Sequence, residues 1–267
     1  MDQTAITSRD NSLLQRARAV REGKIQELIF VEGLRLCEEA LRSNLSIEAV
    51  ISSDEIAEKK RAKEFLEAVA PLANRFASVS EKLLATISFT KTPQGIILLA
   101  ARPKSGRETL VVDQSRRPLL VVMHNINNPV NVGAILRTAE AAGATGAIAT
   151  AHTSDPFSPK ALRGAMGSAF RLPAWFGPTY EEVIAWCEVN GIRSICADAR
   201  GNTNYGAVDW TQPCALILGP ESAGFSPEEL RAAKQSVAVP MQGSVESLNV
   251  AVSAGVLLYE AARQRQS

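Results

Sequence analysis

Three short polar stretches, each placed after an apolar run, hold the residues whose types and spacing could do chemistry. They are NINNPVN after LLVVMH, GPESAGFS after ALILG, and QGSVESLN after VAVPM. Their Gly, Asn, Ser and Pro residues favour turns, and a helical apolar pattern follows each stretch. Backbone N–H groups at helix starts can bind anionic or carboxylate groups. The pattern predicts a ligand site made of three loops, although turn formation alone would explain any single loop.

The usual phosphate-binding and metal-binding motifs do not occur. No GxGxxG follows the first apolar run of this region, and no GxxxxGK[ST] is found, so neither a dinucleotide site nor a P-loop is predicted. Cys37, Cys187, Cys196 and Cys214 form no CxxC pair and have no His at ligand spacing. We therefore expect four reduced thiols, mostly buried, and no metal site.

The elements that must position the three loops alternate between strand and helix. Strands are expected at 119–124, 147–151, 193–198, 215–219 and 237–241, with helices between them and a final helix after residue 249. This order favours a parallel sheet covered on both faces. Ligands of such sheets bind beyond the carboxyl ends of the strands, which is where the three loops would meet.

The first part of the chain also alternates helix and strand, over about 100 residues. We expect residues 1–107 to form a small α/β domain, residues 108–117 to be a linker with a short strand at Thr109–Val112, and residues 118–267 to form the second domain. The run Arg16, Arg18, Arg21 and Lys24 is either a solvated helix face or a patch that contacts phosphates.

The composition of the 267-residue chain is that of a two-domain globular protein, with 46% hydrophobic residues and a net charge of +1. No apolar run reaches the roughly 18 residues of a membrane span. The beginning, MDQTAITSRDNSLLQRARAV, is polar and charged and does not look like a secretory signal. We expect a cytoplasmic protein.

Longer stretches around the three loops resemble a known family. NNPVNVGAILRTAEAAGA, LILGPESAGFS and VPMQGSVESLNVAVSAGVLLYE are similar, in the same order, to the three motifs of the SpoU (TrmH-like) branch of the SPOUT superfamily of RNA 2′-O-ribose methyltransferases. The resemblance spans the whole second domain. Through FVEGLRLCEEAL and FTKTPQGIILL, the first domain resembles the substrate-binding domain of that family, a ribosomal-protein-like RNA-binding fold.

The resemblance implies a fold and an activity. The activity is methyl transfer from S-adenosyl-L-methionine to a ribose 2′-hydroxyl of a structured RNA, with 23S-type rRNA favoured over tRNA. The fold is α/β, with a deep trefoil knot in the C-terminal parallel-sheet domain and a homodimer through that domain. No metal is needed, because the sulfonium methyl donor is already activated. The alternatives are a tRNA 2′-O-methyltransferase and a catalytically silent RNA-binding or ribosome-assembly factor of the same fold.

The matching motif positions supply the candidate site residues. The resemblance implies catalytic roles for Asn131, Arg137, Glu221, Ser247 and Asn249, and cofactor binding by backbone groups of Gly219, Val239 and Leu248. One position departs from the family pattern: Pro220 stands before the acidic residue, where Asn or a small polar residue is common. Because Pro has no N–H, the hydrogen bonding of that loop would differ.

Arg137 has two possible roles. It could form a surface ion pair with Glu140 on its own helix. By resemblance it instead acts at the RNA, either as the base on the ribose 2′-hydroxyl or as an orienting group. Arginine side chains stay protonated near neutral pH, so we expect Arg137 to orient the ribose, with Ser247 or water assisting proton removal.

Helix capping competes with a site role at the other candidate positions. Asn131 could be the N-cap of its helix, and Ser247 or Asn249 that of the last helix. Glu221 could be a carboxylate favouring the helix that follows it. Lys160 and Arg163, one turn apart, face either solvent or RNA.

The final helix is apolar almost all round. We expect one surface to pack on its own sheet, and the resemblance implies that the other packs on a partner subunit. The small residues Ala251, Ala254 and Gly255 would allow close approach.

Overall fold

The structure, a computed structural model, describes residues 4–113, 117–220 and 223–266. The chain divides into two compact units. One comprises Met1–Pro103 with Phe157–Phe170, and the other comprises Lys104–Pro156 with Arg171–Ser267. No helix in the described part of the chain is both long enough and apolar enough to cross a membrane.

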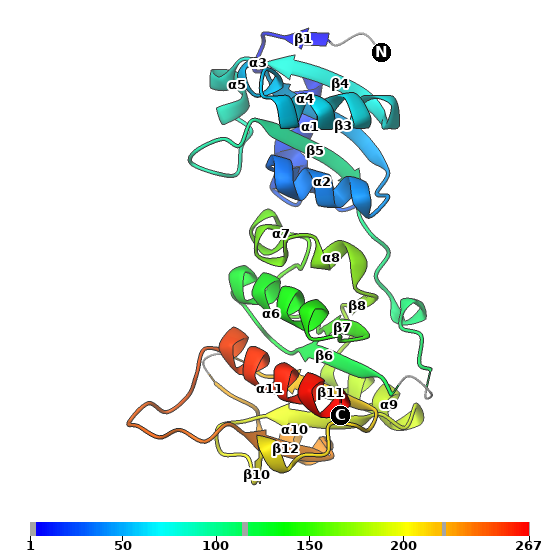
Figure 1. Ribbon diagram of the computed structural model, residues 1–267, viewed down its shortest axis with the longest axis vertical. Coiled ribbons are helices and arrows are strands. Elements are labelled where there is room, and N and C mark those ends of the chain that lie inside the picture. Colours follow the sequence, from blue (N-terminus) through cyan, green and yellow to red (C-terminus); the bar gives the residue numbers. More distant parts are fainter. Residues whose placement is uncertain (1–3, 114–116, 221–222, 267) are drawn as a thin grey trace. The chain divides into compact units, whose positions relative to one another are not determined.

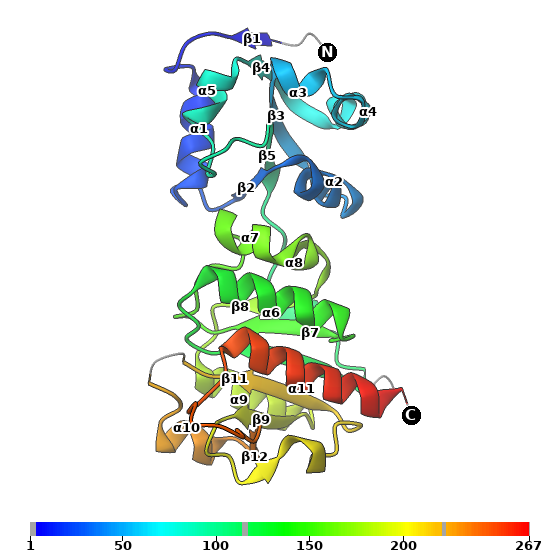
Figure 2. The same cartoon turned by 60° about the vertical axis from the view of Figure 1, so that its left-hand side comes forward.

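The first unit is a five-stranded mixed sheet with helices on both faces (Figure 1, Figure 2). The strands, in sheet order, are β1 (Thr4–Ile6), β4 (Ala73–Val79), β3 (Ile47–Ser53), β5 (Ile96–Ala101) and β2 (Leu28–Glu32). The first three are mutually parallel, and β5 runs antiparallel to both β3 and β2. Its helices are α1 (Ser12–Arg21), α2 (Leu34–Arg42), α3 (Asp54–Ala57), α4 (Lys60–Val69) and α5 (Glu81–Ala85).

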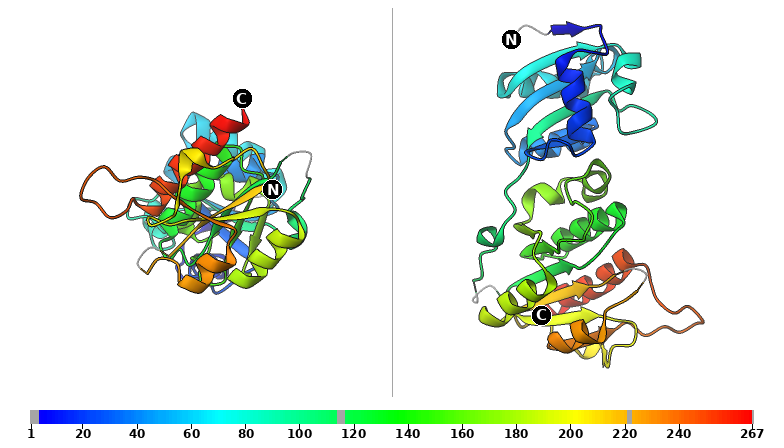
Figure 3. Two further views of the ribbon diagram at one scale, coloured as in Figure 1. Left: turned by 90° about the horizontal axis from the view of Figure 1, so that it is seen from below. Right: turned by 180° about the vertical axis from the view of Figure 1, so that it is seen from behind.

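Apolar residues on both sides of each strand explain why this sheet is covered twice. Ile97 and Leu99 of β5 belong to a core that also contains Leu13 and Leu14 of α1. Leu98, which points the other way because side chains alternate along a strand, is also fully buried. In Figure 1, α2 and α4 lie in front of this sheet, and in the right-hand view of Figure 3, α1 lies in front.

The second unit is a seven-stranded sheet in which every pairing is parallel, as the sequence predicts. The strands, in sheet order, are β10 (Thr203–Asn204), β12 (Gln235–Ala238), β9 (Arg193–Ala197), β11 (Cys214–Leu218), β6 (Leu119–Met123), β7 (Gly146–Ala149) and β8 (Ala174–Phe176). Helices α6 (Pro129–Ala141) and α11 (Val250–Arg265) lie side by side on one face (Figures 1 and 2). Helices α9 (Tyr180–Val189) and α10 (Pro227–Ala232) cover the other face (Figure 3, right).

A short helical segment that follows β7 groups with the first unit. Helix α7 (Pro159–Ala165) begins after Ser158, whose side chain accepts a hydrogen bond from the Ala161 N–H, and it contacts β2. A further short helix, α8 (Ser168–Arg171), follows it. The two basic residues of α7, Lys160 and Arg163, are exposed.

The strand expected at Thr109–Val112 is wrong. Arg107–Thr109 is a 3₁₀ turn, and the hydroxyl of Thr109 lies 2.8 Å from the Gly106 carbonyl oxygen and 2.7 Å from that of Ala174. These side-chain hydrogen bonds fix the turn beside β8, in place of the backbone hydrogen bonds that a strand would make. The short strands β1, β8 and β10 were not predicted, because two or three residues carry no readable alternation.

The four cations of the basic run Arg16 to Lys24 all make contacts within the first unit. Arg16 pairs with Glu48, and Lys24 lies 2.7 Å from Glu22. Arg21 donates to the carbonyl oxygen of Ser88 at 3.0 Å. Within the first unit this run therefore acts mainly in local contacts.

A candidate cofactor cavity at the strand ends

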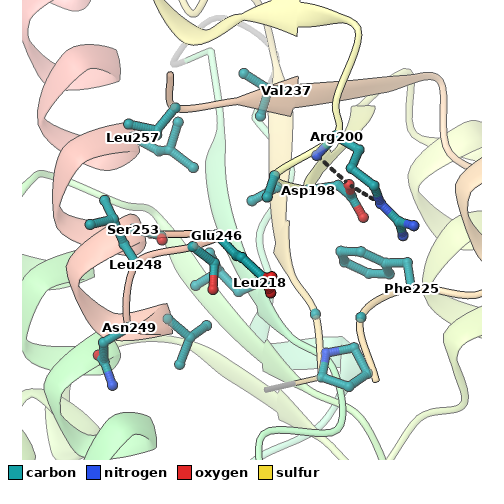
Figure 4. Close-up of a pocket in the computed structure, with 18 of the residues that line it drawn as sticks. Asp198, Arg200, Leu218, Phe225, Val237, Glu246, Leu248, Asn249, Ser253 and Leu257 are labelled. Atoms are coloured by element: carbon teal, nitrogen blue, oxygen red, sulfur yellow. Dashed lines mark hydrogen bonds and ion pairs between the residues drawn. The ribbon is translucent and has the colours of Figure 1, made fainter. Parts of the chain in front are cut away.

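A cavity of about 890 Å³ lies at the carboxyl ends of β9, β11 and β12 (Figure 4). These strands end together because their registers align: Leu218 pairs with Ala197, which pairs with Val237. The chain leaves β11 and β12 in loops that both reach the cavity, and the start of α11 closes it. Two of the three polar stretches identified in the sequence thus line one cavity.

The cavity combines apolar walls with a few charged groups. Its apolar residues include Leu218, Phe225, Val237, Met241 and Leu257. Asp198, Arg200 and Glu246 supply charge. A cavity that combines apolar walls with a few charged and polar groups is typical of a small-molecule site.

All three backbone positions predicted to hold a cofactor line the cavity: Gly219, Val239 and Leu248. Gly219 is tightly enclosed, since an added Cβ would lie 2.5 Å from the ring of Phe225. Ser247 and Asn249 line it too. The roles of these residues stay predictions, but five of the eight predicted site residues share one cavity.

The capping role considered for Asn131 is wrong. The N-cap of α6 is Asn128, whose Oδ1 accepts from the Val130 N–H at 3.0 Å. Asn131 lies in the first turn of the helix, is buried, and accepts at Oδ1 a 3.4 Å hydrogen bond from Nδ2 of Asn249. The side chain is therefore directed across to the start of α11.

Asn249 is the N-cap of α11, and its Oδ1 accepts from the Ala251 N–H at 2.9 Å. The capping role considered for this residue is confirmed. Ser247 is exposed in the preceding loop and makes no hydrogen bond with another described residue. Its hydroxyl is thus available to a ligand.

Arg137 is exposed on α6 and is not among the residues that line the cavity. The ion pair with Glu140, considered as the alternative role of Arg137, is not formed. Glu140 pairs instead with Arg171 through contacts of 2.6 and 2.8 Å. Arg137 makes no ion pair with any residue that the structure describes. Its guanidinium is free to bind an external anion.

Glu221, the predicted acidic residue of the second motif, lies outside the described residues. Its neighbour Pro220, which departs from the family pattern, lines the cavity. The loop therefore presents a ring rather than a backbone N–H at this point.

Sequence reasoning missed Asp198 and Arg200. Asp198 follows β9, its side chain is only 7% exposed, and its Oδ1 accepts from the Arg200 N–H at 2.7 Å. The Arg200 guanidinium lies 3.6 Å from the same oxygen and is 80% exposed. Figure 4 shows both side chains beside Phe225. The position of Asp198 could have identified it, because Asp198 follows the end of a buried strand, as the three recognised loops do.

The ring of Phe225 packs against a polar cluster that contains His124 and Glu229. The Phe225 ring stacks on His124 with centroids 6.1 Å apart, and His124 Nε2 lies 2.7 Å from Glu229 Oε1. Burial alone would raise the pKa of Glu229, but hydrogen bonds from the Ser226 N–H and from His124 outweigh it and lower that pKa. The cluster fixes the wall of the cavity.

The four cysteines are free and buried, as expected. Burial raises the pKa of Cys187 to about 12 and, as the largest of several effects, that of Cys196 to about 11. These thiols stay protonated at neutral pH, which rules them out as ready nucleophiles.

The fold and the cavity define a class: a two-unit α/β protein with a cavity suited to an organic ligand at the carboxyl ends of a parallel sheet. The chain belongs to the SpoU rRNA methylase family, whose model matches residues 118–259. Residues 12–98 match the MRM3-like substrate binding domain. The family expected from the three motifs is thereby confirmed.

Individual relatives match along most of their length. The chain is 30% identical to the 23S rRNA (uridine(2479)-2′-O)-methyltransferase of Streptomyces viridochromogenes, over 89% of this chain and 83% of the relative. It is 29% identical to the 23S rRNA (guanosine(2553)-2′-O)-methyltransferase RlmP of Bacillus subtilis, over 86% of each. The crystal structure of AviRb from Streptomyces viridochromogenes, in complex with the cofactor AdoMet, superposes with a TM-score of 0.85 at 28% identity and covers 96% of this chain and 99% of that one.

Proposed function

We propose that this protein transfers a methyl group from S-adenosyl-L-methionine to a ribose 2′-hydroxyl of ribosomal RNA. The observation that carries the proposal is the single cavity that gathers Gly219, Val239 and Leu248, the three positions assigned to the cofactor from sequence alone. Two relatives named as 23S rRNA 2′-O-methyltransferases and an AdoMet-bound structural neighbour support it.

The residues of the cavity fit this cofactor. S-adenosyl-L-methionine supplies a methyl group activated by a positive sulfonium, and it also carries an ammonium group and an adenine ring. The carboxylates of Asp198 and Glu246 suit the positive groups, and Leu218, Phe225 and Leu257 offer apolar surface for the ring. The enclosed Gly219 leaves the backbone accessible at the cavity wall.

The protein must also hold the acceptor ribose and help remove its proton. We assign the first task to Arg137, whose exposed guanidinium has no partner among the described residues and suits a phosphate or a developing alkoxide. Proton removal falls to Ser247 or to water. Asn131 and Asn249 hold the two helix starts at the site together, and Glu221 is assigned to orient the second loop.

Within this proposal the two parts of the chain divide the work. Residues 1–107 bind the RNA, residues 108–117 link the two domains, and residues 118–267 bind the cofactor. The match of residues 12–98 to a substrate-binding domain supports the first assignment. An rRNA substrate agrees with the cytoplasmic location expected from the sequence.

The homodimer and the trefoil knot are part of the same proposal. On α11, Ala254, Leu257, Leu258 and Ala261 are buried against the chain itself. Val252 and Tyr259, on the opposite side, remain 52% and 55% exposed. An apolar helix with one covered face and one open face is suited to pack against a second copy. The knot is supported by family membership and by the meeting of two loops from different strands at one cavity.

Two measurements test the function. Calorimetry should detect binding of S-adenosyl-L-methionine, and no binding at millimolar cofactor would favour the silent RNA-binding factor. Mapping of 2′-O-methyl groups in total RNA, with and without the gene, should reveal one ribosomal RNA position that depends on it. A lost tRNA position would instead identify a tRNA enzyme, and no lost position would contradict the proposal.

A further inference from the structure

A buried carboxylate in the first unit anchors an exposed loop. Glu32, the last residue of β2, is 6% exposed. Its Oε2 accepts a 2.8 Å hydrogen bond from the Phe89 N–H. Its Oε1 accepts a hydrogen bond from the hydroxyl of Ser88 and another, of 2.9 Å, from the hydroxyl of Thr90. A carboxylate is costly to bury, so three hydrogen bonds to one short segment make Glu32 a strong anchor.

The same segment is held from its other side. Arg21 of α1 donates to the Ser88 carbonyl oxygen at 3.0 Å. The loop between α5 and β5, which contains these residues, projects from the first unit (Figure 1, and Figure 3, right). Glu32 and Arg21 therefore fix the backbone at the base of a projecting loop, which holds the Phe89 side chain in a defined place.

What this loop presents is an aromatic ring among cations. Phe89 is 41% exposed. Lys91, two residues on, is exposed and has no ion pair with a described residue. Arg35 is likewise exposed and has no ion pair with a described residue. The Glu38 carboxylate is hydrogen-bonded by Arg61, which lowers its pKa, and Arg35 helps to lower that pKa.

The sheet register brings Arg35 to the same edge. β2 ends where β5 begins, since Glu32 pairs with Ile97. An added Cβ on Gly33 would lie 3.4 Å from Gln94 of the loop. Arg35 follows two residues after Gly33, in the first turn of α2. One edge of the first unit thus carries an anchored aromatic ring and two exposed cations that form no ion pair with a described residue.

We infer that this edge binds an unpaired RNA nucleotide, with its base stacked on Phe89 and adjacent phosphates near Lys91 and Arg35. Bases stack on exposed aromatic rings irrespective of their identity, and unpaired Lys and Arg attract the backbone. The inference rests on the proposed function and adds where the substrate unit reads unpaired RNA.

A protein partner fits this edge less well. Protein interfaces bury contiguous apolar surface at their centre. In the described part of the first unit, the only large hydrophobic residues that are exposed are Phe89 and Leu72. Leu72 precedes β4, which begins beside the start of β3, whereas β5 begins beside the end of β3. The two residues therefore lie at opposite ends of the sheet, and Phe89 is isolated among polar neighbours.

Fluorescence anisotropy of the full chain with a single-stranded 12-nucleotide RNA, and with a duplex of equal length, tests the inference. Phe89→Ala should weaken single-strand binding about tenfold to a hundredfold, the loss of one base–aromatic stack. Phe89→Trp should restore it. Leu72→Ala is the matched control, with an exposed apolar residue removed at the other end, and should bind as the wild type does. Lys91→Ala should weaken binding and lower the salt dependence of log K by about one unit.

The outcomes separate this inference from the proposed function. If the wild type does not bind the single strand in 0.1 M salt, or if Phe89→Ala binds within twofold of it, the stacking site is wrong. The stacking site is also wrong if Phe89→Trp fails to restore single-strand binding, or if Phe89→Ala weakens duplex binding to the same extent. Calorimetry with S-adenosyl-L-methionine should give the same affinity for every variant. If the wild type does not bind S-adenosyl-L-methionine, that result would contradict the methyltransferase proposal and leave the RNA result unaffected.

Discussion

Asn249 and Asn131, 118 residues apart in the chain, are joined by a side-chain hydrogen bond of 3.4 Å between Nδ2 and Oδ1. The bond links the residue that caps α11 to the first turn of α6. Each residue belongs to a different sequence motif, so this contact is where two of the three motifs meet. The same Asn249 side chain has a second task, because its Oδ1 caps α11.

The two tasks of Asn249 can be separated. Asn249→Ser should keep the cap and lose the bond to Asn131, whereas Asn249→Ala should lose both. We expect the Ala variant to be about 1 kcal/mol less stable than the Ser variant, the usual worth of a cap. Urea unfolding measures this, and calorimetry measures the affinity for S-adenosyl-L-methionine. Equal stability of the two variants would show that the cap contributes nothing.

Arg137 should matter for methyl transfer but not for stability. It is exposed and unpaired among the described residues, so Arg137→Lys should change the free energy of unfolding by less than about 0.5 kcal/mol. Because Lys cannot bind an oxyanion through two parallel N–H groups, turnover should fall about tenfold or more, with cofactor affinity unchanged. Arg231→Lys, on α10 at the other face of the sheet, is the control. Near-normal turnover of Arg137→Lys would exclude a bidentate role.

Gly219 should be intolerant of any side chain. A Cβ there would lie 2.5 Å from the Phe225 ring, which is itself packed on His124. We expect Gly219→Ala to displace the cavity wall and weaken cofactor binding about tenfold. Gly243→Ala is a matched glycine control in the loop after β12, where an added Cβ meets nothing within 4 Å. Calorimetry measures the cofactor affinity of both variants. Weakened binding in Gly219→Ala alone would show that the cavity wall is displaced, whereas weakened binding in both would show that any added side chain in these loops is harmful.

Long, continuous sequence patterns predicted the structure correctly, and isolated residues did not. The parallel sheet was predictable because its buried strands are continuous apolar runs, and the loops after β11 and β12 because their turn residues follow those runs. Asp198 was not predictable by motif, since one carboxylate after a strand has no distinctive neighbours. Asn131 was considered as the cap of α6, and Asn128 was overlooked, because Pro129 was not taken as the first helical residue, a position that Pro favours. The 3₁₀ turn at Arg107 depends on Thr109 meeting Ala174, a contact that local sequence does not encode.

The proposed dimer predicts that charge on the open face of α11 will produce monomers. Val252→Asp combined with Tyr259→Asp places two carboxylates on that face, where burial against a second copy would leave them unpaired. Analytical ultracentrifugation should show a dimer for the wild type and a monomer for this variant. Val189 on α9 is 86% exposed and lies on the other side of the sheet, so Val189→Asp should leave the dimer intact. A dimer that survives both carboxylates would place the interface elsewhere.

Glu229 should make stability depend on pH in the acid range. Its pKa is lowered in the folded state from an ordinary 4.5. A carboxylate with a depressed folded pKa contributes stability that is complete above its unfolded pKa and is lost as the pH falls through the folded one. At pH 7 we expect Glu229→Gln to cost about 1–2 kcal/mol, because hydrogen bonds from Ser226 and His124 to a charged acceptor are weakened.

The difference between wild type and Glu229→Gln should therefore shrink as the pH is lowered below 4.5. Urea unfolding at a series of pH values measures it. Glu228→Gln, on the same helix with its side chain 74% exposed, controls for the loss of a surface carboxylate and should show little effect at any pH. A constant difference across the series would mean that Glu229 stabilises α10 through its geometry alone, without its charge.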